Sequence, residues 1–121
     1  MSLADRHAQG NYTIAVKSTI IGAKVLNEAK EDLGKIEDLI IDARTSVVVY
    51  AILSFGGFLG LGDKRFAIPW RVLDFHAPEG YAILPLDKER LKNAPGFKAD
   101  EWPDMSTREW INSIDDHFGT R

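Results

Sequence analysis

The chain has 121 residues, of which 45% are hydrophobic and 27% are charged, a composition typical of one globular domain that builds its own core. Fifteen basic and eighteen acidic residues give a net charge of −3, which argues against nucleic-acid binding because phosphate contacts need a basic excess. The sequence contains no cysteine, so disulfides, thiolate catalysis and cysteine zinc sites are excluded.

The first residues carry no signal for export or membrane insertion. Residues 1–10 lack the apolar segment of a secretory signal, and no apolar run approaches the roughly 20 residues that cross a bilayer. We therefore expect no direct membrane insertion and, by default, a cytoplasmic location, with a removed leader as the alternative. Residues 1–17 are expected to form a flexible arm that contains one short edge strand at 12–16.

Runs of β-branched and aromatic residues predict a mainly β domain over residues 18–86. A cluster of valines makes the run at 46–55 the strongest of them. Turn-forming residues separate the runs, and five or six short strands at such spacing are typical of a small antiparallel barrel or sandwich. The expected strands cover residues 35–42, 46–55, 64–69, 72–75 and 81–84.

The predicted strand at 35–42 has a fault in its alternation. Its apolar residues include Ile36, Leu39 and Ile41, and strict alternation fails between the first two. One extra residue, at position 37 or 38, would restore the register. Such an extra residue is a β-bulge, which bends a strand as the closure of a small barrel requires. The alternative is that residues 40 and 41 are both buried, on opposite faces.

The predicted strand at 46–55 is apolar on both faces, so the face that does not fill the interior needs a cover. The C-terminal extension, residues 87–121, offers one. Ser106 and Glu109 have the spacing of a capping box, which predicts a helix over about 106–118 that Gly119 ends. We expect this helix to cover the sheet, with a partner subunit as the alternative. Its apolar face consists of Trp110, Ile111, Ile114 and Phe118, and its water-facing side of Asn112, Asp115 and Asp116.

Four segments, taken in order, resemble the PRC-barrel family: 33–42, 53–60, 66–73, and 91–97 followed by Trp102-Pro103. The first resembles the signature strand of the family, and the last is similar to the tail of free-standing bacterial members. The resemblance covers about residues 18–118. It implies a small β-barrel like those of the photosynthetic reaction-centre H subunit and of a maturation factor of the small ribosomal subunit. Those relatives use the barrel to dock within larger assemblies, not as an enzyme.

Patterns for catalysis and cofactor binding are missing from the sequence. The Gly-rich segment 56–63 lacks the spacing of a phosphate-binding loop and leads into a strand instead of a helix. His7, His76 and His117 share no element, and no serine or carboxylate pair has the partner that would make it a nucleophile or a general base. We therefore expect no enzyme activity, no cofactor and no metal.

These patterns favour a non-enzymatic protein–protein interaction module that associates with itself, as a homodimer or other homo-oligomer, or with a larger assembly. The residues expected at the contact are Phe58, Leu59, Leu61, Trp70 and Arg71. Alternatively, Phe58, Leu59 and Leu61 of the Gly-rich segment fold back over an open barrel end, and Trp70 fills the interior. The alternative function is a small-ligand-binding barrel, although side chains normally fill a barrel of five or six strands.

Overall fold

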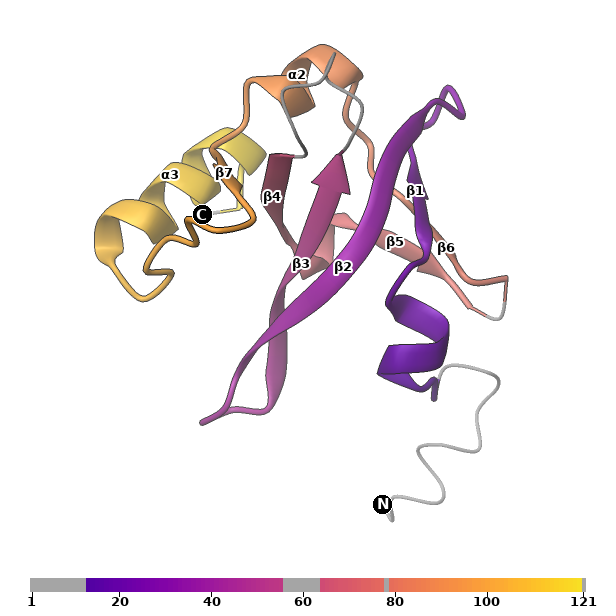
Figure 1. Cartoon of the computed structure of the whole chain (residues 1–121), viewed down its shortest axis with the longest axis horizontal. Coiled ribbons are helices and arrows are strands. Elements are labelled where there is room, and N and C mark those ends of the chain that lie inside the picture. Colours follow the sequence, from indigo (N-terminus) through magenta and orange to yellow (C-terminus); the bar gives the residue numbers. More distant parts are fainter. Residues whose placement is uncertain (1–12, 56–63, 78, 121) are drawn as a thin grey trace.

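The computed structural model describes residues 13–55, 64–77 and 79–120 (Figure 1). They form a mainly β fold in which seven strands make one sheet, in the order β5-β6-β1-β2-β3-β4-β7. The strands are β1 (Lys24–Leu26), β2 (Asp32–Asp42), β3 (Val47–Phe55), β4 (Lys64–Pro69), β5 (Asp74–His76), β6 (Tyr81–Ile83) and β7 (Gly96–Lys98). The helices are the π-helical turn η1 (Val16–Ile20), the 3-10 turn η2 (Trp70–Val72), α2 (Lys88–Lys92) and α3 (Arg108–Phe118).

The sheet differs from the expected antiparallel barrel of five or six strands. It has seven strands, and β1 pairs with β6 in parallel. The sheet ends at β5 on one side and β7 on the other, and no hydrogen-bonded ladder joins these two strands within the described ranges. The two strands absent from the expected set are β1 and β7, which have three residues each.

Strand β2 carries the predicted β-bulge. Its pairing with β3 moves from Ile36↔Leu53 to Asp38↔Ile52, so Glu37 is the extra residue. A second irregularity lies nearer the turn, where Val49 of β3 has no partner on β2. Because each bulge bends the strand that holds it, the β2–β3 hairpin curves along its length.

The core has two parts, one on each face of the sheet. The first cluster fills the concave side and includes Phe66 and Leu53, which are fully buried. The second cluster joins Tyr50, Ile52 and Ala67 of the sheet to Ile114 of α3. Figure 1 shows α3 lying beside β4 and β7. The expectation that the C-terminal helix covers the second face of the sheet is therefore confirmed.

The ends of α3 correct one prediction and confirm another. The N-cap is Thr107, whose Oγ1 accepts a hydrogen bond from the backbone N–H of Trp110 at 3.2 Å. Ser106 was predicted to cap the helix, but its hydroxyl donates to Asp104 Oδ1 at 2.5 Å. At the other end Gly119 adopts a φ of 65°, the left-handed conformation that ends helices.

Two further expectations were wrong, one about a strand and one about the exposure of a side chain. The predicted edge strand near the N-terminus is not present at residues 13–16: Val16 begins η1, and the half-buried Ile14 packs against the first core cluster. On α3, Asp115 does not simply face water. It is half-buried and its Oδ1 accepts a hydrogen bond from the Thr120 hydroxyl at 2.6 Å. Residues 1–12 lie outside the described part of the chain.

Candidate docking surface

A groove of about 820 Å³ lies at the turn end of the β2–β3 hairpin. One wall is the hairpin itself, and the other is formed by η2 and α3, from which Trp70, Arg71 and Ile111 line the groove. We call this feature the hairpin groove. Figure 1 shows the hairpin extending beyond the neighbouring strands, which leaves this end of the sheet open.

Exposed apolar side chains gather in the hairpin groove. Six large hydrophobic residues of the described chain are exposed, and four of them line the groove. These four are Ile41 (57% exposed), Val47 (56%), Val49 (36%) and Ile111 (38%). Single exposed apolar residues are ordinary, whereas a contiguous set marks a surface that another molecule covers. The arrangement is that of an interaction surface.

The hairpin exposes Ile41, Val47 and Val49 because its neighbouring strands end before the turn. β4 pairs with β3 from Phe55↔Lys64 only as far as Tyr50↔Pro69. Proline has no N–H for the next ladder bond, and the chain turns into η2 directly after Pro69. On the other side of the hairpin, β1 pairs with β2 only up to Lys35. The turn end of the hairpin therefore has no strand neighbours in the part of the chain that the structure describes.

Charges of both signs surround the apolar residues. At the hairpin turn, Arg44 Nη2 lies 3.5 Å from Asp42 Oδ2. The Arg44 backbone N–H, and then its guanidinium, hold the pKa of the Asp42 carboxyl below its usual value. On the opposite wall, Arg71 Nη2 donates to the Thr120 carbonyl oxygen, close to the Asp115–Thr120 hydrogen bond. Each wall thus carries one acidic and one basic side chain.

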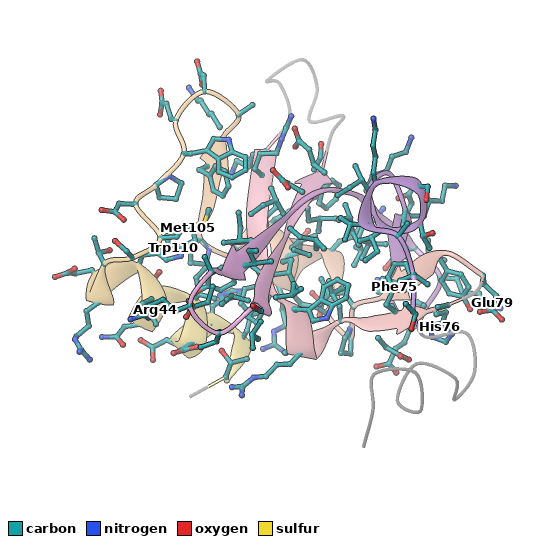
Figure 2. The ribbon with its side chains drawn as sticks, turned by 90° about the horizontal axis from the view of Figure 1, so that it is seen from below. Arg44, Phe75, His76, Glu79, Met105 and Trp110 are labelled. Atoms are coloured by element: carbon teal, nitrogen blue, oxygen red, sulfur yellow. The ribbon has the colours of Figure 1, made fainter. Side chains whose placement is uncertain are left out.

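The end of the molecule opposite the hairpin groove carries one histidine beside a carboxylate. Figure 2 shows His76 and Glu79 at the opposite end of the molecule from Arg44. His76 Nε2 lies 3.0 Å from Asp74 Oδ2, and its ring stacks on Tyr81. No three metal-ligating side chains gather among the residues described. Nor is any helix of the described ranges long and apolar enough to span a membrane.

The model of the PRC-barrel domain family matches residues 17–91, which is more than half of the chain. The chain belongs to the PRC-barrel family. A search of curated proteins found no similar sequence. The family match agrees with the resemblance in segments 33–42, 53–60 and 66–73, and it ends within α2. Because α3 lies after the matched residues, the part of the groove wall that α3 forms lies outside the family match, whereas η2 lies within it.

The residues predicted at a contact have different positions in this PRC-barrel protein. Trp70 is half-buried: it packs against the first core cluster, lies 6.1 Å from Phe75 between ring centroids, and also lines the groove. Arg71 is exposed on the rim. Phe58, Leu59 and Leu61 lie outside the described residues.

The four exposed apolar residues were missed as a group. The signal in the sequence was a predicted strand at 46–55 with no polar face, which required a cover. α3 covers that face at Tyr50 and Ile52, but at Val47 and Val49 the cover is incomplete. How far a cover extends depends on tertiary structure and cannot be found from the strand alone.

Proposed function

We propose that this PRC-barrel protein is a non-enzymatic interaction module that associates with a second copy of itself through the hairpin groove. The observation that carries the proposal is the gathering of Ile41, Val47, Val49 and Ile111 around one open groove. Burial of such residues in a contact contributes about 25 cal/mol for each Å² of apolar surface removed from water. The activity proposed is therefore assembly by surface contact.

The charges at the groove support a second copy as the occupant. Asp42 and Arg44 lie on the hairpin wall, and Arg71 and Asp115 on the other. In a two-fold symmetric contact the same patch meets itself, so a patch with both signs on both sides can complement its own copy. Such charges fix orientation more than they add affinity.

The packing of the first core cluster supports contact over the alternative function, an internal ligand site. The inner face of the curved sheet is filled by buried side chains, and the largest of them are at most 1% exposed. The largest of these are Phe66, Leu33, Ile36, Leu53 and Ile68. A cargo on that side would have to displace them, which costs several kcal/mol per large residue.

A pair of matched charge substitutions tests the proposal. Val47 in the groove and Val16 outside it are similarly exposed, at 56% and 49%. Sedimentation equilibrium of the wild type should show a dimer whose dissociation constant rises by at least about tenfold in Val47→Glu, since burying an unpaired carboxylate costs more than the about 1.4 kcal/mol that tenfold represents. Val16→Glu should dimerise like the wild type. A wild type that stays monomeric, or equal effects of the two substitutions, would contradict the proposal.

A further inference from the structure

The turn end of the β2–β3 hairpin has two backbone edges without a strand neighbour among the described residues. One is the outer edge of β2 beyond Ile36, where pairing to β1 has ended. The other is the edge of β3 over Val47–Val49, beyond the last β3–β4 pair. An edge of this kind presents N–H and C=O groups to which another strand can bind. The two edges differ in the side chains beside them.

Acidic residues lie along the β2 edge. Asp38, which is exposed, and Asp42 fall within this part of the strand, whereas the neighbouring Glu37 forms an ion pair with Arg65 of β4. If two copies paired along this edge, acidic residues of one strand would lie close to those of the other. Charged side chains on an edge strand, and like charges across a strand pair, both oppose such pairing.

The β3 edge has the opposite character. Val47, Val48 and Val49 are uncharged and β-branched, which suits a paired strand. All three line the hairpin groove, together with Pro69, where β4 leaves the sheet. The groove is thus the position that a further strand would occupy if pairing to β3 continued past Tyr50.

We propose that a second copy fills this position with its own Val47–Val49, in antiparallel pairing about a two-fold axis at Val48. The inference rests on the proposed function and specifies its geometry. In this register Val48 lies opposite the partner's Val48, and Val47 lies opposite the partner's Val49. The centre is Val48 because it is the middle residue of the free run, and symmetry about a single residue keeps paired side chains on the same face of the joined sheet.

The antiparallel register also aligns the charges. Along the first copy, from Val47 through Val49 to Tyr50, the antiparallel strand of the second copy leads back toward its own turn, which precedes its β3. Its turn, with the partner's Asp42 and the partner's Arg44, therefore approaches η2 and the end of α3. Arg71 and Asp115 lie there. Each acidic residue of the turn can meet a basic residue of the other wall, and each basic residue an acidic one.

Single cysteine substitutions test the register, because the chain has no cysteine of its own. Directly opposed residues of an antiparallel pair have Cα atoms about 4.5–5.5 Å apart, within the range that a disulfide spans. Under mild oxidation Val48→Cys should give covalent dimer as its main product. Val47→Cys and Val49→Cys should each link poorly alone and link to each other when mixed. Asp38→Cys, exposed on the β2 edge, gives the collisional background.

The outcomes separate the register from the function. Covalent dimer from Val48→Cys, or from the Val47→Cys and Val49→Cys mixture, above the Asp38→Cys background supports the β3-edge contact. A protein that sediments as a dimer while none of these links forms above background, or while Asp38→Cys links fastest, overturns the register and leaves self-association intact. A protein that sediments only as a monomer overturns both. Circular dichroism confirms that each variant is folded, and the mixed pair serves if Val48→Cys is not.

Discussion

Gly34 of β2 lies so close to the Ser54 carbonyl oxygen of β3 that a β-carbon at position 34 would overlap it. The same β-carbon would lie 3.2 Å from Phe55 Cα, so backbone atoms of two residues occupy the space. Gly34 also has a φ of 115°, a conformation that residues with a β-carbon rarely adopt. The first pairs of the β2–β3 ladder therefore depend on the absence of a side chain at this position.

Substitution of Gly34 should be strongly destabilising. We expect Gly34→Ala to lower the free energy of unfolding by about 2–4 kcal/mol, because strain at φ and a clash with backbone add together. Gly22→Ala is the matched control: Gly22 has a φ of 89°, but a β-carbon added there would have nothing within 4 Å, so only about 1–2 kcal/mol of conformational strain applies. Urea denaturation measures both. Equal losses would mean that the close approach to Ser54 is unimportant.

The two isoleucines of α3 should differ sharply in their contribution to stability. Ile114 is completely buried against the sheet, whereas Ile111 is 38% exposed in the groove. Ile114→Ala should cost about 2–5 kcal/mol of unfolding free energy through lost burial and a cavity, and Ile111→Ala much less in the monomer. Thermal and urea unfolding at low protein concentration measure this contrast. A large loss from Ile111→Ala under those conditions would show that it serves the core instead of the surface.

The buried Tyr50 hydroxyl should make stability depend on alkaline pH. Burial, and secondly the negative charge of Asp115, raise the pKa of Tyr50 above its ordinary value of 10.0. The folded chain then keeps a proton that the unfolded chain releases, so the free energy of unfolding should fall as the pH rises from about 10 toward the folded pKa. Tyr50→Phe should remove this part of the pH dependence.

A second substitution separates the two causes of the Tyr50 shift. Asp115→Asn removes the charge and should lower the pKa of Tyr50 only in part, because burial is the larger cause. The difference in tyrosinate absorbance between the wild type and Tyr50→Phe, followed through a pH titration, isolates this residue from the other two tyrosines. A Tyr50 that titrates at its ordinary value in the wild type would contradict both expectations.

Local signals in the sequence predicted local features well. The failed alternation between Ile36 and Leu39 indicated the bulge now seen at Glu37, because side-chain direction in a strand follows directly from residue spacing. Gly119 ends α3 for an equally local reason. The N-cap was misplaced by one residue because Ser106 and Thr107 are both suitable capping residues, and the choice depends on Asp104, which binds the Ser106 hydroxyl.

Features that depend on distant residues were not predictable in the same way. The parallel pairing of β1 with β6 joins segments from opposite ends of the family domain. The exposure of Val47 and Val49 depends on where β4 ends, at Pro69. A sequence can show that a strand needs a cover on each face, but the extent of that cover is decided by how far each neighbouring strand continues.

The parallel pairing of β1 with β6 has a consequence for the order of folding. The β2–β3–β4 meander connects segments that follow one another in the chain, whereas β1 acquires its second neighbour only when residues 81–83 are in place. Contacts between remote segments carry a larger loop-closure cost and form slowly. During synthesis, therefore, the outer side of β1 stays open until residues 81–83 have left the ribosome, and the pairing of β7 with β4 waits for the still later residues 96–98.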